Sequence, residues 1–155
     1  MKFSDIKDFE ADATGGPFKL SAHKGKAVVL YFYPKDNTPG CTTEGVEFRD
    51  LAPEFSRAGA LIVGVSRDSL KSHQNFKARL ALPFELISDP DEKLCETFGV
   101  MKLKNMYGKQ VRGVERSTFV FDAHGKPARE WRGVKAPGHA AEVLEFVKTL
   151  KQQLK

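Results

Sequence analysis

Two unbroken apolar segments constrain the fold of this 155-residue sequence more than any other feature. Residues 27–33 (AVVLYFY) and 60–66 (ALIVGVS) contain no charged residue and are rich in valine, isoleucine or aromatic residues. Strands that are buried on both faces of a sheet carry such continuous runs. Residues 42–58, between the two runs, have helical apolar spacing and include Pro53, which we expect to kink or divide the helix. The order predicts a parallel strand–helix–strand crossover.

The rest of the chain continues this alternation. The further elements that we expect are a hairpin within residues 1–26 with a turn at 15–17, a helix over 69–82 with Ser69 as N-cap, a strand over 84–88, a helix from Asp89-Pro90 to Gly99, a loop over 99–113, a hairpin of 117–122 and 126–132, and a helix from Gly138 onward. The pattern predicts one α/β domain over residues 1–155: a thioredoxin-like sandwich with a mixed central sheet, helices on both faces and an extra N-terminal hairpin.

Composition excludes several classes of protein. Hydrophobic residues make up 41% and charged residues 29% of the chain, which is typical of a globular protein. No apolar run approaches the roughly 18 residues needed to span a bilayer. Residues 1–16 carry too many charges for a signal peptide. We therefore expect a cytoplasmic protein without membrane association, in which two cysteines do not form a permanent disulfide.

Charge and motif searches give no sign of a nucleic-acid or metal-binding protein. The net charge is +5, but the basic residues are scattered among acidic ones and no recognition motif accompanies them. The four histidines show neither HxxH nor HExxH spacing, so we expect no metal site. None of them has a local signature that would support a Cys–His protease. GxGxxG and P-loop patterns are also absent from the sequence.

Cys41 is the residue that most strongly indicates chemistry. It follows the loop residues Thr38, Pro39 and Gly40 and opens the helix predicted after the first apolar run. Free backbone N–H groups and the helix dipole favour an anion at such a position, and the thiolate is the reactive form of cysteine. A buried cysteine that acts as a small hydrophobe is the ordinary alternative. The polar and loop-forming neighbours favour a nucleophile, provided that the thiol is accessible.

The loop lacks the second cysteine of a dithiol enzyme. Thioredoxin-like oxidoreductases need Cys-x-x-Cys at this junction. Here Thr38 occupies the position three residues before Cys41, and Glu44 occupies the position three residues after it. Disulfide exchange within the loop is therefore impossible. A hydroxyl at position 38 can instead hold a small polar substrate against the sulfur.

The pattern Pro34-x-x-x-Thr38-x-x-Cys41 resembles the active-site signature of the peroxiredoxins. The longer stretch PKDNTPGCTTE resembles the bacterioferritin comigratory protein, or peroxiredoxin Q, branch, and the similarity covers nearly the whole chain. The resemblance implies a thioredoxin fold and reduction of hydrogen peroxide and organic hydroperoxides without metal, haem or flavin. It assigns Cys41 as the peroxidatic cysteine, Thr38 and Arg116 as its activating partners, and Pro34 as a shield of the pocket. A guanidinium at position 116 could stabilise both the thiolate and the leaving oxygen.

Attack on a peroxide would convert Cys41 to a sulfenic acid, which must then be reduced. The positions where relatives carry a resolving cysteine hold Val46 and the segment 76–78, so Cys95 is the remaining candidate. Because Cys95 lies on the predicted packing face of a helix, we expect it to be buried. We predict a monomeric one-cysteine enzyme that is reduced by thioredoxin, glutaredoxin or a small thiol. A Cys41–Cys95 disulfide, or a non-enzymatic binding or chaperone module, remains the alternative.

Overall fold

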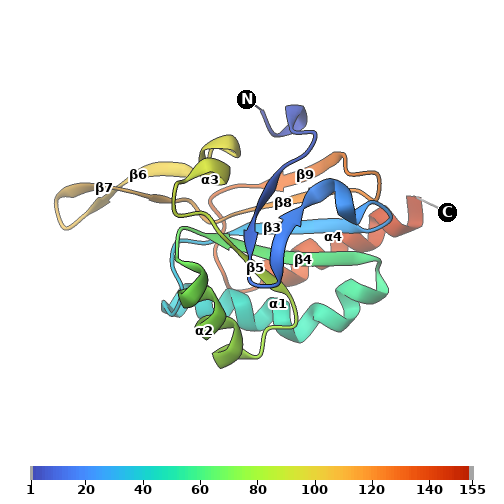
Figure 1. The fold of residues 1–155 in the computed structure, drawn as a ribbon, viewed down its shortest axis with the longest axis horizontal. Helices are drawn as coiled ribbons and strands as arrows, with labels where there is room; N and C mark the ends of the chain where they lie inside the picture. The colour runs from blue at the N-terminus through green and yellow to red at the C-terminus, as the bar shows by residue number, and fades with distance from the viewer. Residues whose placement is uncertain (1, 154–155) are drawn as a thin grey trace.

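The computed structural model describes residues 2–153 (Figure 1). Its elements, with η for a 3₁₀-helix, are η1 (Phe3–Asp5), β1 (Glu10–Ala13), β2 (Gly16–Lys19), η2 (Leu20–His23), β3 (Ala27–Phe32), α1 (Pro39–Arg57), β4 (Ala60–Ser66), α2 (Leu70–Leu80), β5 (Glu85–Ser88), α3 (Lys93–Thr97), β6 (Met101–Met106), β7 (Lys109–Val114), β8 (Ser117–Phe121), β9 (Pro127–Trp131) and α4 (His139–Gln153). No helix in this range combines the length and apolarity needed to cross a membrane.

Within the described residues, seven strands form one sheet in the order β2-β1-β5-β4-β3-β8-β9. The strands β3, β4 and β5 are parallel, as expected for helical crossovers, whereas β8 runs antiparallel to β3 and pairs with β9 as a hairpin. The N-terminal hairpin extends the sheet, because β1 pairs with both β2 and β5. Its turn lies at residues 14–15, one residue earlier than expected. The mixed sheet and the extra hairpin are confirmed.

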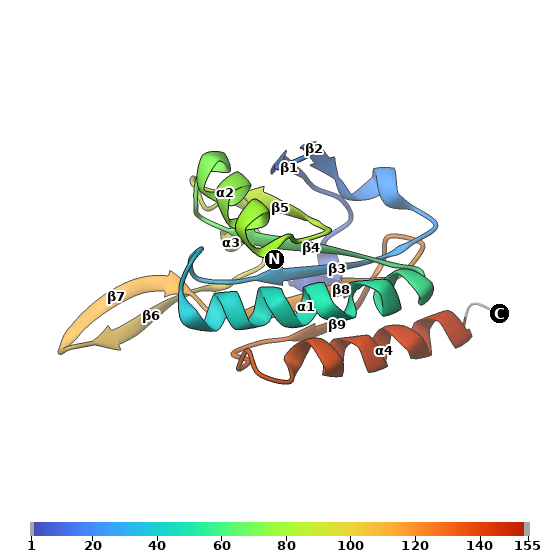
Figure 2. The same ribbon diagram turned by 90° about the horizontal axis from the view of Figure 1, so that it is seen from below.

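Side chains of the central strands alternate between two separate cores. Along β3, Val29 and Tyr31 belong to one core, and Val28 and Leu30 belong to the other. The helices α1, α2 and α4 contribute to the first, which we call the α1-side core, while η1 and α3 contribute to the second, the α3-side core. Figure 2 shows α1 and α4 side by side on the face of the sheet that carries the α1-side core. Helices therefore cover both faces, as predicted.

Three helix predictions are refined by the structure. Ser69 caps α2 as expected, because its Oγ accepts a hydrogen bond from the Ser72 N–H (3.1 Å). The helix α1 runs through Pro53 and is not divided there. The helix expected from residue 90 starts only at Lys93, since the Asp89 carboxylate accepts hydrogen bonds from the backbone N–H groups of residues 94 and 95 and so caps it from a distance.

The prediction of a loop over residues 99–113 is wrong, because β6 and β7 form a separate two-stranded sheet there. Tyr107 and Gly108 make the connecting turn, and both have positive φ (53° and 78°). All side chains from 102 to 112 are exposed, so neither face of the hairpin shows the apolar alternation by which a strand is normally recognised. The turn also lacks the Asn-Gly or Asp-Gly sequence that signals a hairpin.

Candidate active site

The structure places Cys41 where the sequence predicts it, in the first turn of the helix that follows a central strand. Thr38 is the N-cap of α1, with extended backbone (φ −90°, ψ 153°), and Pro39 is the first helical residue. The first helical hydrogen bond joins the Thr42 N–H to the Thr38 carbonyl oxygen (2.9 Å). Because β3 ends at Phe32, the site lies beyond the carboxyl end of a parallel strand, where ligand sites of α/β proteins gather.

Arg116 joins Cys41 to a second residue of α1. Its Nη2 donates to the Cys41 sulfur at 3.4 Å, and its Nη1 donates to Glu44 Oε1 at 2.6 Å. The arginine precedes β8, which pairs directly with β3, so the sheet brings residues 41 and 116 together. Cys41 is only 2% exposed and Glu44 is fully buried, whereas Arg116 is partly covered. The guanidinium thus places a positive charge in direct contact with a sulfur that solvent hardly reaches.

The charges of Glu44 and Arg116 depend on each other. Burial raises the pKa of Glu44 to about 7, although the neighbouring Arg116 favours its ionised form. Burial disfavours the charge of Arg116, but the Glu44 carboxylate and the Cys41 sulfur outweigh this effect and raise the pKa of the guanidinium. Glu44 Oε2 is buried and has no hydrogen-bond partner among residues 2–153, so only one oxygen of the carboxylate is paired there. Arg116 therefore stays protonated and positively charged, while Glu44 can gain or lose a proton near neutral pH.

Sequence reasoning did not assign Glu44 or Gly40 to the site. Glu44 follows Cys41 by three residues, and this helical spacing, which puts two side chains on one face, was the signal that could have found it. A Cβ atom at Gly40 would lie 3.0 Å from Arg116 Nη2, a tight contact that would require the guanidinium to shift by a few tenths of an ångström. Glycine at position 40 thus leaves the space that the guanidinium occupies beside the sulfur.

The other two predicted site residues lie in the same loop but do not contact the sulfur through a hydrogen bond. The Thr38 hydroxyl donates to the Lys35 carbonyl oxygen (2.8 Å) and so stabilises the loop before α1. Pro34 directly follows Tyr33 and is half-buried. In this structure the Thr38 hydroxyl therefore bonds to the backbone of the preceding turn and not to the Cys41 sulfur.

A buried polar network fastens this loop to α2. Asp36 Oδ2 lies 2.7 Å from His73 Nδ1 and accepts a hydrogen bond from Ser72 (2.8 Å), while Asp36 Oδ1 accepts from the Tyr33 hydroxyl (2.6 Å). The backbone N–H of Asp36 donates to Asp68 Oδ2 (2.9 Å). Buried groups with all their partners present rigidify their surroundings. The network therefore fixes the loop from which α1 starts.

Asp36, Asp68 and His73 also bring three potential metal-ligating atoms within 4.8 Å of one another, although their sequence spacing matches no metal motif. The second ring nitrogen of His73 faces the Ile87 carbonyl oxygen at 2.9 Å. Both ring nitrogens are thus already in hydrogen-bond contact with buried oxygen atoms of the protein. We assign the cluster to the loop network.

The two buried histidines, His73 and His139, form no hydrogen bond with Cys41 within the part of the chain that the structure describes. His73 is held by Asp36 and the Ile87 carbonyl oxygen, and His139 lies between Thr118 (2.8 Å) and Glu142 (3.1 Å). The Arg116 guanidinium, which donates to the sulfur, stays protonated and cannot remove a proton. The contacts of Cys41 are therefore not those of the nucleophile of a Cys–His protease.

Cys95 lies in the α3-side core and is fully buried, as predicted. Burial raises the pKa of the Cys95 thiol, and the nearby Asp89 carboxylate adds to the effect. The two cysteines belong to different cores, because Cys41 packs in the α1-side core. The seven-stranded sheet therefore separates their side chains.

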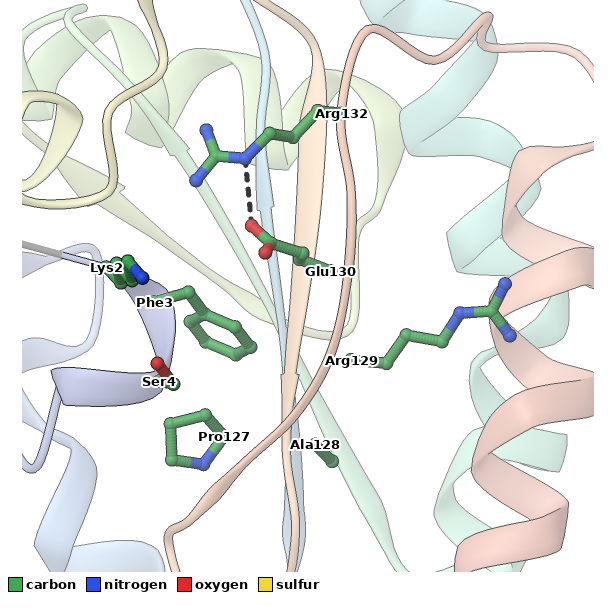
Figure 3. A pocket seen from close by; sticks show the side chains of 8 residues that line it. All are labelled: Lys2, Phe3, Ser4, Pro127, Ala128, Arg129, Glu130 and Arg132. Carbon is green, nitrogen blue, oxygen red and sulfur yellow. Dashed lines mark hydrogen bonds and ion pairs between the residues drawn. The ribbon is translucent and has the colours of Figure 1, made fainter.

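A pocket remote from Cys41 shows no comparable convergence of side chains. It has a volume of about 480 Å³ and lies between η1 and β9 (Figure 3). Glu130 pairs with Arg132 at 2.8 Å, and Arg129 turns away so that its guanidinium carbon lies 4.5 Å from the Trp131 ring centre. Since Glu130 and Arg132 are engaged with each other and Arg129 is directed elsewhere, we assign this pocket no ligand.

Comparison with known proteins agrees with this geometry. The AhpC/TSA family matches residues 4–127. A peroxiredoxin Bcp from Xanthomonas campestris is 58% identical over 134 residues, which cover 86% of this chain and 84% of the relative. A peroxiredoxin Bcp from Bacillus subtilis is 50% identical over 139 residues, which cover 90% of this chain and 88% of the relative.

Solved structures give the same result. The bacterioferritin comigratory protein of X. campestris, described with alkyl peroxide reduction activity, superposes with a TM-score of 0.87 at 53% identity and covers 92% of both chains. Peroxidoxin BcpB from Mycobacterium tuberculosis superposes with a TM-score of 0.81 at 34% identity, covering 93% of this chain and 94% of its own. The chain belongs to the AhpC/TSA family, in the Bcp or peroxiredoxin Q branch, as the sequence motif predicted. It is therefore a thiol-dependent peroxidase with a thioredoxin-like fold, which acts on peroxides and requires a thiol reductant.

Proposed function

We propose that the enzyme reduces hydrogen peroxide and organic hydroperoxides by a one-cysteine cycle centred on Cys41. The Cys41 thiolate attacks the terminal oxygen of the peroxide, and the O–O bond breaks. The sulfur becomes a sulfenic acid, and the bond's electron pair leaves with the second oxygen, which takes up a proton to give an alcohol or water. The alkyl peroxide activity described for the X. campestris relative supports organic peroxides as substrates.

In this cycle Arg116 is the residue that stabilises charge. Its guanidinium donates to the sulfur at 3.4 Å and can follow the negative charge as it moves from sulfur to the leaving oxygen. Glu44 orients the guanidinium through its 2.6 Å contact, and Gly40 leaves space for it. Thr38 and Pro34 act less directly in this proposal, Thr38 by holding the turn before α1 and Pro34 by covering the loop.

The separation of the two thiols by the sheet is the observation that carries the one-cysteine proposal. Cys41 belongs to the α1-side core and Cys95 to the α3-side core. A disulfide needs Cα atoms within about 7 Å of each other and sulfurs that meet directly. To form one here, α1 and α3 would both have to leave their cores and pass around a sheet edge. An internal disulfide would therefore require extensive unfolding.

Reduction then falls to an external thiol. This thiol attacks the sulfenic acid, releases water and forms a mixed disulfide with Cys41. A second thiol attacks the mixed disulfide, leaves as the oxidised reductant and returns Cys41 to the thiol. Because Cys41 is 2% exposed, a reductant larger than a peroxide needs the first turn of α1 to open. Pro39 and Gly40 form this turn, and glycine is a poor helix former.

Intact-mass spectrometry after one equivalent of peroxide tests the proposal. We expect wild type to gain one oxygen, and Cys95→Ser to gain the same mass and keep full turnover with dithiothreitol. Cys41→Ser should neither gain oxygen nor consume peroxide above background. A loss of two hydrogens in wild type, together with lost turnover in Cys95→Ser, would replace this cycle by a Cys41–Cys95 disulfide mechanism.

A further inference from the structure

The hairpin β6–β7 is the most conspicuous surface feature that the peroxidase chemistry does not use. Figures 1 and 2 show it projecting from the body of the molecule, at the end where α1 begins. Its six-residue strands give it a reach of about 20 Å. Four large apolar side chains on it are exposed: Leu103, Met106, Tyr107 and Val111. Apolar side chains gathered on a protrusion commonly mark an interaction site.

The two faces of the hairpin differ in their partners. On one face, Arg112 pairs with Glu92 and Glu96, which tethers the hairpin toward α3. The opposite face, which we call the free face, presents Lys102, Lys104, Met106, Lys109 and Val111. Within residues 2–153, no carboxylate lies within ion-pair distance of these three lysines. The Lys104 ammonium donates to the Val114 carbonyl oxygen (2.9 Å), so the free face is a small apolar centre bordered by three lysines that form no ion pair within residues 2–153.

The tip of the hairpin holds a residue that the turn itself does not favour. Tyr107 has φ +53° and is 99% exposed. A two-residue turn with two positive φ angles prefers asparagine or aspartate followed by glycine, and bulky residues are strained there. The Tyr107 side chain buries almost none of its surface against the rest of the described chain. An aromatic side chain kept at a strained and fully exposed position indicates contact with another molecule.

Charge and position indicate what kind of molecule this is. Residues 101–114 contain four basic and no acidic residues, so the hairpin carries most of the chain's net charge of +5. Two copies would therefore repel each other at this surface, and an acidic partner is favoured. The hairpin ends at Val114, two residues before the arginine that contacts Cys41. A molecule held on it would lie at the same end of the enzyme as the reactive sulfur.

We propose that the free face and tip of the β6–β7 hairpin form the docking surface for the protein that reduces Cys41, a dithiol protein with an acidic surface around its thiols. This rests on the proposed function, because only an externally reduced enzyme needs such a partner. A small thiol needs no surface of this size. Docking at this end raises the local concentration of the partner's thiol near the first turn of α1, so that attack can follow whenever that turn opens.

The test compares turnover with a protein reductant and with a small thiol. Peroxide turnover is measured with thioredoxin, excess thioredoxin reductase and NADPH, then with glutaredoxin, and separately with dithiothreitol. Lys102→Glu/Lys109→Glu reverses two charges of the free face. Lys24→Glu/Lys26→Glu is the matched control, since these exposed lysines precede β3, at the opposite end of that strand from Cys41. We expect kcat/KM for the protein reductant to fall about tenfold in the hairpin variant and less than about twofold in the control.

A second variant separates docking from folding. Tyr107→Asn supplies the residue that the turn prefers, so its thermal midpoint should equal or exceed that of wild type. Its kcat/KM for the protein reductant should nevertheless fall about threefold or more. In both hairpin variants the dithiothreitol rate should stay within about twofold of wild type.

Four results would overturn docking: unchanged kcat/KM, an equal loss with dithiothreitol, an equal loss in the control variant, or turnover with dithiothreitol but with neither protein reductant. A change in self-association or in binding to anionic lipid vesicles, without a change in kcat/KM, would assign the surface to another occupant and also overturn it. Failure of the proposed function would give a different result from failure of docking. Wild type would then not turn over with any thiol, or the Cys95→Ser variant would lose its turnover.

Discussion

Replacing Glu44 with glutamine should change how the stability of the protein depends on pH. The folded-state pKa of about 7 lies above the ordinary value of 4.5, because the carboxyl is buried and only one of its oxygens is paired. As pH rises from 4.5 to 7, the unfolded chain loses this proton before the folded one, so stability falls. The difference of 2.5 units corresponds to about 3 kcal/mol, fully lost above pH 7. A glutamine at position 44 has no proton to lose.

Urea unfolding between pH 5 and pH 8 measures this effect. The variants Cys41→Ser and Cys41→Ser/Glu44→Gln are compared, so that no thiolate titrates beside Arg116. The free energy of unfolding of the double variant should rise relative to its parent by about 2 kcal/mol or more across this range. Cys41→Ser/Glu145→Gln is the control, since Glu145 is largely exposed, and its curve should run parallel to that of the parent. Parallel curves for the Glu44 variant would refute the claim that burial holds a proton on this residue.

Two further substitutions test the site through the rate of Cys41 oxidation in stopped-flow experiments. Arg116→Ala should slow oxidation at least tens of times, because loss of one charge-stabilising donor costs about 3 kcal/mol; an unchanged rate, or an equal loss in the exposed Arg57→Ala, would contradict its role. Gly40→Ala should slow oxidation without loss of stability, since its Cβ would meet Arg116 Nη2 at 3.0 Å while alanine favours the helix. Gly45→Ala, whose Cβ would have 3.5 Å to its nearest neighbour, should keep the wild-type rate, and equal effects of the two would exclude the steric explanation.

The parts of the fold that are buried on both sides could be predicted from sequence, and the exposed parts could not. The runs at 27–33 and 60–66 became β3 and β4 because an apolar run of that length fits only a covered strand. The hairpin at 101–114 was missed because both of its faces are exposed to solvent. Its sequence therefore shows no alternation of apolar and polar residues. Its structure is set by backbone pairing and a turn at residues 107–108, which leave little trace in residue type.

The residues of the candidate site also differ in how far the sequence alone could identify them. Cys41 could be proposed as the nucleophile from the sequence alone, because the proposal depends on a local position at the start of a helix. Arg116 is 75 residues away, and only the pairing of β8 with β3 brings it to the sulfur, so it was found through family resemblance and not through physical reasoning. The loop network of Asp36 and His73 depends on two distant segments in the same way. Long-range partners of a site require the topology to be known first.

The two cysteines show that burial alone does not decide the reactivity of a thiol. Cys41 is 2% exposed and Cys95 is 0% exposed, so solvent reaches both equally poorly. They differ in the sign of the neighbouring charge. A guanidinium contacts Cys41, whereas burial and the carboxylate of Asp89 raise the pKa of the Cys95 thiol and keep it protonated. Because the thiolate is the form that attacks a peroxide, the same oxidant can consume one cysteine and spare the other. The sheet preserves this difference, since it keeps the arginine with one thiol and the aspartate with the other.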